Sequence, residues 1–222
     1  MRLSMKQGVG LTSLSARQRL TASLAAKGIS NDLVLSAIET VPRHLFVDSS
    51  IEHLAYEDMA LPIGQRQTIS QPYVVALMSQ AVVEIPNVKS VLEIGTGCGY
   101  QAAILSQLVS KVYSIERIHS LALDARLRLQ DLKYSNVWLK YGDGQEGWAA
   151  HAPFDGIIIT AATRSIPSRL KSQLTDNGKI IAPKGHRHQQ SLVVTERKDD
   201  RWQERKLAPV VFVPLLSGTQ QE

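Results

Sequence analysis

The sequence predicts an α/β fold in which helices cover both faces of a doubly wound, mostly parallel sheet. From Ser90 onward, short apolar runs alternate with segments of helical periodicity, and continuous apolar runs are typical of strands buried on both faces. Strands that alternate with helices indicate right-handed crossover units. A glycine-rich turn at residues 95–99 follows the first apolar run, and it predicts a ligand site at the carboxyl edge of the sheet.

Composition narrows the kind of protein. With 222 residues, 44% of them hydrophobic and 20% charged, the chain can bury a full core. The longest apolar stretches, residues 74–83 and 156–162, are far shorter than the roughly 20 residues that cross a bilayer, so we expect no membrane partner. The N-terminus lacks the apolar segment of a secretion signal, and Cys98 has no cysteine to pair with. Both features predict a cytoplasmic protein.

We expect neither a metal ion nor a nucleic acid as a partner. No group of Cys and His residues has the spacing of metal ligands, which argues against a metal site. The net charge of +5 favours acidic partners, but Lys and Arg are interspersed with Asp and Glu, so charge alone does not predict nucleic-acid binding. A monomer is favoured.

The N-terminal third is predicted to be helical with one long loop. Apolar residues recur at three- and four-residue spacing through residues 14–41, which predicts two helices, the second capped by Asn31 or Asp32. Periodicity is lost over residues 42–71, where we expect a long ordered loop, and long loops in compact domains are often functional. A helix then begins at Pro72, a residue suited to a first helical turn.

The remaining residues are predicted to form the sheet. Five buried strands are expected at residues 91–94, 112–115, 137–139, 156–160 and 179–182, with helices at 100–108, 119–132 and 167–174. Two further β segments are predicted at residues 191–195 and 210–214. The charged stretch between them, residues 196–206, is predicted to be a solvated connection.

The glycine-rich turn favours a nucleotide-like ligand other than a dinucleotide. Its pattern is G-x-G-x-G, and Tyr100 stands where a dinucleotide fingerprint has its third glycine, which disfavours NAD. The acidic Glu93 just before the turn would repel a pyrophosphate. It suits the positive sulfonium and amino groups of S-adenosylmethionine instead.

Two further acidic residues follow the next two predicted strands. Glu116 lies roughly 20 residues after the turn, where an acid commonly binds ribose hydroxyls. Asp143 follows the third strand and could accept a hydrogen bond from the adenine amino group. Alone, either glutamate would more often be a solvated strand end, and Gly-Asp-Gly a tight turn. Their combination and order favour a cofactor crevice.

Several segments together carry a resemblance to a known family. They are residues 41–47 (VPRHLFV), 61–64 (LPIG), 67–72 (QTISQP), 91–103, 142–144 (GDG), 147–148, 152–155 with Ile157, and 212–215 (FVPL). In these segments, and over roughly residues 14–216, the chain resembles the protein-L-isoaspartate O-methyltransferases, which methylate the abnormal carboxyl group formed when Asn deamidates or Asp isomerises. Arg66 departs from the pattern, because relatives usually carry a small or polar residue there, and the first dozen residues match nothing in the family.

The resemblance implies a Rossmann-like, class I methyltransferase fold over residues 1–222 as a single domain. It divides the chain into N-terminal helices and a substrate loop (14–83), an S-adenosylmethionine-binding core (88–183) and C-terminal strands (184–216). The implied partners are isoaspartyl-containing proteins and peptides. The implied cofactor contacts come from Glu93, Gly95, Thr96, Gly97, Gly99, Glu116, Arg117, Asp143 and Gly144.

The resemblance also implies the reaction, in which methylation of the isoaspartyl α-carboxylate leads to repair through a succinimide. That carboxylate is already ionised at pH 7, so no general base is needed, and catalysis is expected to be mostly positioning. Ser70 resembles the family's active-site serine and would orient the carboxylate. From local sequence alone, Ser70 is a helix cap. The implied substrate contacts are Leu61, Pro62, Ile63, Thr68, Ile69 and Gln71.

Three other readings remain. An adenine methyltransferase would carry Asn or Asp, two prolines and an aromatic after the fourth strand, where a flipped base is gripped, but Thr160 begins the stretch TAAT there. A binding module without catalytic activity would be expected to have lost the crevice glycines or acids, and this chain retains all of them. A methyltransferase acting on small molecules is not excluded by the cofactor residues.

Overall fold

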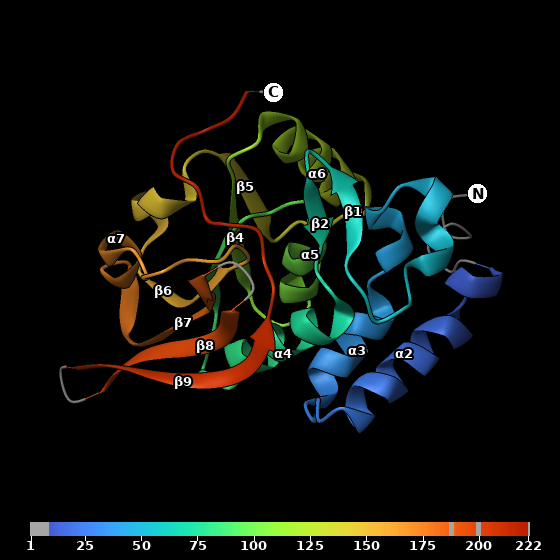
Figure 1. Cartoon of the computed structure of the whole chain (residues 1–222), viewed down its shortest axis with the longest axis horizontal. Helices are drawn as coiled ribbons and strands as arrows, with labels where there is room; N and C mark the ends of the chain where they lie inside the picture. Colours follow the sequence, from blue (N-terminus) through green and yellow to red (C-terminus); the bar gives the residue numbers. More distant parts are fainter. Residues whose placement is uncertain (1–8, 187–188, 199–200, 222) are drawn as a thin grey trace.

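The computed structural model describes residues 9–186, 189–198 and 201–221. In these residues the central element is a seven-stranded sheet with the order β5-β4-β3-β6-β7-β8-β9 (Figure 1). The parallel strands are β3 (Ser90–Ile94), β4 (Lys111–Glu116), β5 (Val137–Tyr141), β6 (Phe154–Ile159) and β7 (Leu174–His186). The antiparallel strands at one edge are β8 (Gln189–Lys198) and β9 (Arg201–Val210). The predicted fold class is confirmed.

The strand order creates a crevice in the middle of the sheet. From β3 the chain moves outward through β4 to β5, and it then returns to the other side of β3 to place β6 and β7. The carboxyl ends of β3 and β6 are therefore a switch point, where connections leave in opposite directions. Open α/β sheets bind ligands at this position.

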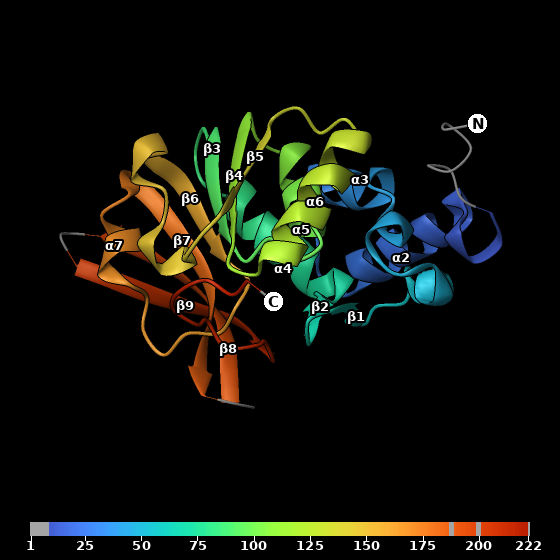
Figure 2. The ribbon, with the colours of Figure 1, turned by 90° about the horizontal axis from the view of Figure 1, so that it is seen from above.

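Helices cover the two faces of the sheet unequally. α4 (Pro72–Val83), α5 (Tyr100–Ser106) and α6 (His119–Asp131) lie along one face, and α2 (Leu14–Ala26) and α3 (Asp32–Thr40) pack outside them (Figure 2). The opposite face is covered by the short helix α7 (Ser168–Lys171) and two 3₁₀ turns, η4 (Gly144–Glu146) and η5 (Ala149–His151). A further 3₁₀ turn, η1 (Gly10–Thr12), precedes α2.

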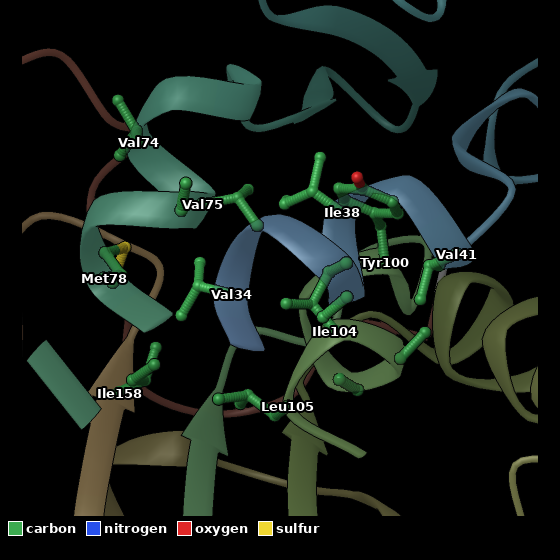
Figure 3. Packing of buried hydrophobic residues seen from close by; sticks show 14 of the residues in the cluster. Val34, Ile38, Val41, Val74, Val75, Met78, Tyr100, Ile104, Leu105 and Ile158 are labelled. Carbon is green, nitrogen blue, oxygen red and sulfur yellow. The ribbon is translucent and has the colours of Figure 1, made fainter. Parts of the chain in front are cut away.

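Adjacent residues along each central strand supply two separate apolar cores. Ile158 of β6 belongs to the core on the α4 and α5 side, whereas its neighbours Ile157 and Ile159 belong to the core on the α7 side. Figure 3 shows the first core, in which side chains from α3, α4 and α5 meet above β6. Full burial of each such side chain contributes about 1.5–3 kcal/mol. The central strands are continuous apolar runs in the sequence because both of their faces are covered.

Helices α3 and α4 begin at the positions that the sequence predicts. The Asn31 side chain accepts hydrogen bonds from the backbone N–H groups of Leu33 and Val34, so Asn31 rather than Asp32 caps α3. Pro72 is the first residue of α4, where its missing N–H leaves no hydrogen bond unmade.

The predicted long loop contains more structure than its sequence indicates. It holds the 3₁₀ turns η2 (Arg43–Phe46) and η3 (Ser49–Leu54), followed by a small antiparallel hairpin of β1 (Leu61–Gly64) and β2 (Gln67–Ile69). Strands this short show little alternation, so the hairpin was not predicted. It projects next to the carboxyl edge of the main sheet.

The prediction of a solvated connection at residues 196–206 is wrong. Residues 196–198 extend β8 and residues 201–206 form most of β9, while residues 199–200 lie outside the described residues. The final predicted strand at 210–214 is irregular after Val210 apart from one bridge at Pro214. The charged residues suit strands at a sheet edge, where they face water and discourage pairing with other chains. Two of them form ion pairs with β7, Lys179 with Glu196 at 3.0 Å and Lys184 with Glu204 at 2.6 Å.

Candidate active site

A cavity of about 690 Å³ opens at the carboxyl edge of the sheet, beside the switch point. Its walls come from the β1–β2 hairpin, the ends of β3 and β4, the segment after β6, and residues 209–216. The predicted site residues that line it are Thr68, Ser70, Gln71, Gly95, Gly97, Glu116, Arg117 and Gly144. The fold therefore brings the substrate loop and the cofactor loop, which are separate in the sequence, to one cavity.

Ser70 lies between the end of β2 and the start of α4 and is partly buried in the cavity wall. The N-cap residue of α4 is Gln71, and its side chain makes no capping hydrogen bond. Within the described part of the chain, no hydrogen bond of the Ser70 hydroxyl is found. The local interpretation of Ser70 as a helix cap is therefore wrong, and the hydroxyl is free to bind a ligand.

Asp58, which the sequence did not single out, organises the start of α4. Its Oδ1 accepts a hydrogen bond of 2.8 Å from the Tyr73 backbone N–H, and its Oδ2 lies 2.6 Å from the Lys27 Nζ. The Gln71 side chain donates to the Asp58 carbonyl and carboxylate. Gln71 therefore lines the cavity with its amide already engaged. No local pattern marks Asp58, because its partners lie 13 to 31 residues away.

The other predicted substrate residues divide between core and surface. Leu61 and Ile69 pair across the hairpin and are each 3% exposed, so they anchor it to the core and do not line the cavity. Pro62 is exposed and Ile63 half-buried, and neither lines the cavity. Ile63 lies close to the glycine-rich turn, since a Cβ added at Gly97 would be 3.3 Å from its Cδ1.

The glycine-rich turn, called the glycine loop below (residues 95–99), is held from the β6 side by Thr160. The Thr160 hydroxyl lies 2.6 Å from the Gly95 carbonyl oxygen and 2.9 Å from that of Ile94. Gly95 has a φ of +96°, and a Cβ there would clash with the Thr160 Oγ1. Only glycine therefore fits the first loop position. The local sequence gives no sign that Thr160 holds this loop, because its partners lie 65 and 66 residues away.

Glu93 lies beneath the glycine loop and not in the cavity wall. Its side chain is 0% exposed, the Ser114 hydroxyl donates a hydrogen bond to its Oε2, and Ser114 Oγ is 2.6 Å from Thr96 Oγ1. Burial raises the pKa of Glu93 to about 8, and the nearby Glu116 charge acts in the same direction. Glu93 therefore does not face the cavity, contrary to the prediction that it contacts a cationic ligand directly. It supports the glycine loop from below. Thr96 is likewise buried, at 4% exposed.

Glu116 ends β4 and lines the cavity, and its binding of a cofactor hydroxyl stays a prediction. Its Oε2 accepts a hydrogen bond of 2.8 Å from the Gly97 N–H, and its Oε1 accepts one of 2.9 Å from the Ile118 N–H. The carboxylate thereby joins the glycine loop to the end of β4. Each carboxylate oxygen can accept a second hydrogen bond, so Glu116 can still bind a hydroxyl in the cavity. Gly99, in contrast, packs against Leu129 and does not line it.

Asp143 and Arg117 bind the end of the chain. The Asp143 carboxylate accepts hydrogen bonds from the backbone N–H groups of Gln145 and Gly218. The Arg117 guanidinium donates to the Gly218 carbonyl and the Gln220 side chain. Asp143 does not line the cavity. The structure therefore does not support the predicted contact between Asp143 and an adenine amino group. Arg117 and Gly144 do line it.

The C-terminal tail (residues 211–221) supplies a wall that sequence reasoning missed. Pro214, Leu215 and Leu216 line the cavity, and Gln220 forms a parallel bridge with Ile118 beyond it. The tail crosses the centre of the molecule in Figure 1. Its sequence resembles an ordinary strand end, so nothing local indicates a role at the site.

No group of three or more His, Cys, Asp or Glu side chains that could hold a metal ion occurs among residues 9–186, 189–198 and 201–221. In the same residues, every helix is too short or too polar to cross a bilayer.

Known proteins resemble this chain along nearly its whole length. The family model for protein-L-isoaspartate(D-aspartate) O-methyltransferase matches residues 15–220. The protein-L-isoaspartate O-methyltransferase of Halorhodospira halophila is 52% identical over 211 residues, covering 95% of this chain and 96% of that protein.

Two solved structures share the fold of this chain. A protein-L-isoaspartate O-methyltransferase superposes with a TM-score of 0.80 at 28% identity, covering 89% of this chain and 65% of that one. A Plasmodium falciparum structure in complex with S-adenosyl-L-homocysteine shares the fold, with a TM-score of 0.78 at 23% identity over 90% of this chain and 98% of that one. The chain belongs to the protein-L-isoaspartate(D-aspartate) O-methyltransferase family.

Proposed function

We propose that this protein transfers a methyl group from S-adenosylmethionine to the α-carboxylate of L-isoaspartyl residues in damaged proteins. The observation that carries the proposal is the position of Ser70, whose hydroxyl lines the same cavity as the glycine loop and Glu116 and has no partner in the described residues. Family membership supports the same reaction. The protein is thus a transferase that begins protein repair.

The cavity fits S-adenosylmethionine in volume and chemistry. At about 690 Å³, it lies within the range of small-molecule and cofactor sites. Glycines at 95, 97 and 144 leave its wall without side chains, which allows close approach of a ligand to backbone. Glu116 at the end of the second parallel strand is placed to accept hydrogen bonds from ribose hydroxyls, and Leu215 and Leu216 supply an apolar wall.

The bound cofactor supplies an electrophilic methyl group on a sulfonium. The acceptor carboxylate is ionised at neutral pH, so Ser70 acts as a hydrogen-bond donor that holds one carboxylate oxygen while the other forms the bond to the methyl carbon. The products are a methyl ester and S-adenosylhomocysteine, and no proton is transferred. The ester then closes to a succinimide without the enzyme, and hydrolysis returns some normal aspartyl peptide. Ser70 therefore contributes by positioning.

The proposal includes the setting in which the enzyme works. We place it in the cytoplasm as a monomer, without nucleic-acid or membrane partners. Its single thiol, Cys98, is 6% exposed, and burial raises the pKa of this thiol, so it is a poor nucleophile.

Transfer of labelled methyl to a peptide with one isoaspartyl residue tests the reaction. The normal aspartyl twin of the peptide and a small-molecule carboxylate serve as alternative acceptors. We expect selective, base-labile labelling of the isoaspartyl peptide. Equal labelling of the twin, or none despite measurable S-adenosylhomocysteine binding, would direct the search to other acceptors.

A Ser70→Ala variant tests the role of the hydroxyl. Loss of one hydrogen bond to a charged group is expected to lower kcat/KM about 10- to 100-fold, equivalent to about 1.5–3 kcal/mol. S-adenosylhomocysteine affinity should stay near that of the wild type. The matched control is Ser50→Ala, which removes an exposed hydroxyl whose one hydrogen bond in the described residues is to Asp48. Full activity of Ser70→Ala would contradict the assigned role.

A further inference from the structure

The β1–β2 hairpin, which contributes to the cavity wall, has an unusual turn. Gly64 pairs with Gln67, which leaves Gln65 and Arg66 as the two central turn residues. Their φ angles are +50° and +56°. Two-residue hairpins with positive φ at both central positions strongly favour Asn-Gly or Asp-Gly, because glycine adopts this conformation without strain. A long side chain at the second position is therefore unfavourable for the hairpin alone.

Arg66 lines the cavity beside Thr68 and Ser70, and its side chain is exposed. Gln65, its partner in the turn, does not line the cavity. In the described part of the chain, the Arg66 guanidinium makes no hydrogen bond and no ion pair. Strained residues persist where the surrounding structure or the function requires them, and no hydrogen bond or ion pair of Arg66 within the described residues accounts for its conformation.

The charge balance around the cavity indicates what Arg66 binds. Among the described lining residues, the carboxylate of Glu116 is bonded to two backbone N–H groups and the guanidinium of Arg117 to the C-terminal tail. Arg66 is thus the described lining cation that has no intramolecular acceptor. An arginine binds carboxylates through its planar fork of N–H donors.

We propose that Arg66 is a specificity-determining residue that selects isoaspartyl peptides with a second carboxylate, on a residue adjacent to the isoaspartyl residue. The proposal rests on the proposed function. Ser70 orients the reacting carboxylate deeper in the site, and Arg66 at the tip of the hairpin contacts the neighbouring acidic side chain. Because Arg66 is exposed, the attraction is modest and is weakened by salt.

Matched peptides measure this selectivity. One isoaspartyl peptide is made with Glu, Gln or Lys directly before or directly after the isoaspartyl residue, and kcat/KM is measured for each with wild type and Arg66→Gly. In the wild type we expect the Glu peptide to exceed the Gln peptide about threefold on at least one side, as a difference in KM. This ratio should approach one in Arg66→Gly and in wild type at high salt.

Two further variants separate charge from backbone conformation. Arg66→Lys keeps the charge and should retain a preference for Glu over Gln. Gln65→Gly changes the same turn and should leave the preference unaltered. Both glycine variants should raise the melting temperature by about 3 °C, since each removes a left-handed non-glycine residue, but only Arg66→Gly should lose selectivity.

Three results would overturn the proposal. They are a Glu-to-Gln ratio of one in the wild type, an unchanged ratio in Arg66→Gly, and an equal loss for all three peptides in Arg66→Gly, which would assign Arg66 to the reacting carboxylate. If the wild type methylates none of the isoaspartyl peptides although it binds S-adenosylhomocysteine, the proposed function fails, and with it this inference.

Discussion

Glu93 is a carboxyl group that the fold holds away from water, at 0% exposed beneath the glycine loop. Its Oε1 has no hydrogen-bond partner among the described residues, so the charged form is poorly stabilised and the pKa is raised to about 8. The folded protein consequently keeps a proton on Glu93 at a pH where the unfolded chain releases it. Hydrogen bonding to Ser114 opposes this shift without cancelling it.

This pKa shift predicts a pH dependence of stability. Between the ordinary pKa of 4.5 and the folded value of about 8, the folded state binds more protons than the unfolded state, so the free energy of unfolding falls as pH rises. A Glu93→Gln variant has no such titration. Relative to wild type, it should therefore become more stable between pH 5 and pH 8, measured by urea denaturation at both pH values.

The control for this prediction is Glu57→Gln, which removes an exposed carboxyl group. Its difference from wild type should change much less over the same pH range. If Glu93→Gln and wild type keep a constant difference in unfolding free energy, Glu93 is ionised in the folded protein at pH 5 and the prediction is wrong.

At the scale of elements, the C-terminal tail acts as a strap across the ends of β4 and β5. The Gln220 N–H donates to the Arg117 carbonyl at 2.8 Å, and the Gln220 carbonyl accepts from the His119 N–H at 3.0 Å. Tyr141, at the end of β5, donates its hydroxyl to the same carbonyl at 3.2 Å. These bonds hold residues 214–216 in the cavity wall.

A chain that ends at Ser217 is therefore expected to bind S-adenosylhomocysteine more weakly. It loses the hydrogen bonds of Gly218 and Gln220 to Arg117 and Asp143, which leaves the apolar wall unsupported. We expect the Kd from calorimetry to rise about tenfold, equivalent to about 1.4 kcal/mol.

Thr219→Ala is the matched control for the truncation, because Thr219 is exposed and makes no hydrogen bond in the described residues. It should bind S-adenosylhomocysteine like the wild type. Unchanged affinity in the truncated chain would mean that residues 214–216 hold their position without the strap.

At the scale of the whole molecule, one cavity joins three distant parts of the chain. The hairpin near residue 66, the strand ends near residues 95 and 116, and the tail near residue 215 all line it. A ligand in the cavity contacts each of these parts, so its binding energy adds to the stability of the folded state. That the chain unfolds as one domain stays a prediction.

S-adenosylhomocysteine should accordingly raise the melting temperature. At 100 times its Kd, it stabilises the folded state by about 2.7 kcal/mol, which corresponds to roughly 5–10 °C for a chain of this size. Ser70→Ala should show the same increase, because Ser70 belongs to the acceptor side. Gly95→Ala should show little increase, since a Cβ at this position would clash with Thr160. If S-adenosylhomocysteine raised the melting temperature of Gly95→Ala as much as that of the wild type, the glycine loop would not be part of the binding site.

The sequence alone determined the features that depend on local pattern. Continuous apolar runs identified the parallel strands β3 to β7, because a strand covered on both faces has few polar positions. The expectation of five buried strands is wrong for β5, which lies at the edge of the sheet and is only partly buried. The spacing of glycines and acids identified the glycine loop and Glu116, since a turn after a strand is specified by the residues within it. The same local patterns identified Asn31 as one of two candidate caps.

Only the tertiary structure decided what depends on residues far apart in the chain. Burial placed Glu93 beneath the loop, and a contact with Asp58 explained the position of Gln71. The tail is held across the cavity because Asp143 accepts a hydrogen bond from the Gly218 N–H and Arg117 donates one to the Gly218 carbonyl. Such contacts leave no periodic trace, because each joins residues 13 or more positions apart. Residues 196–198 and 201–206 were wrongly predicted to be a loop for the same reason, since a charged strand differs from a loop only in the strand it pairs with.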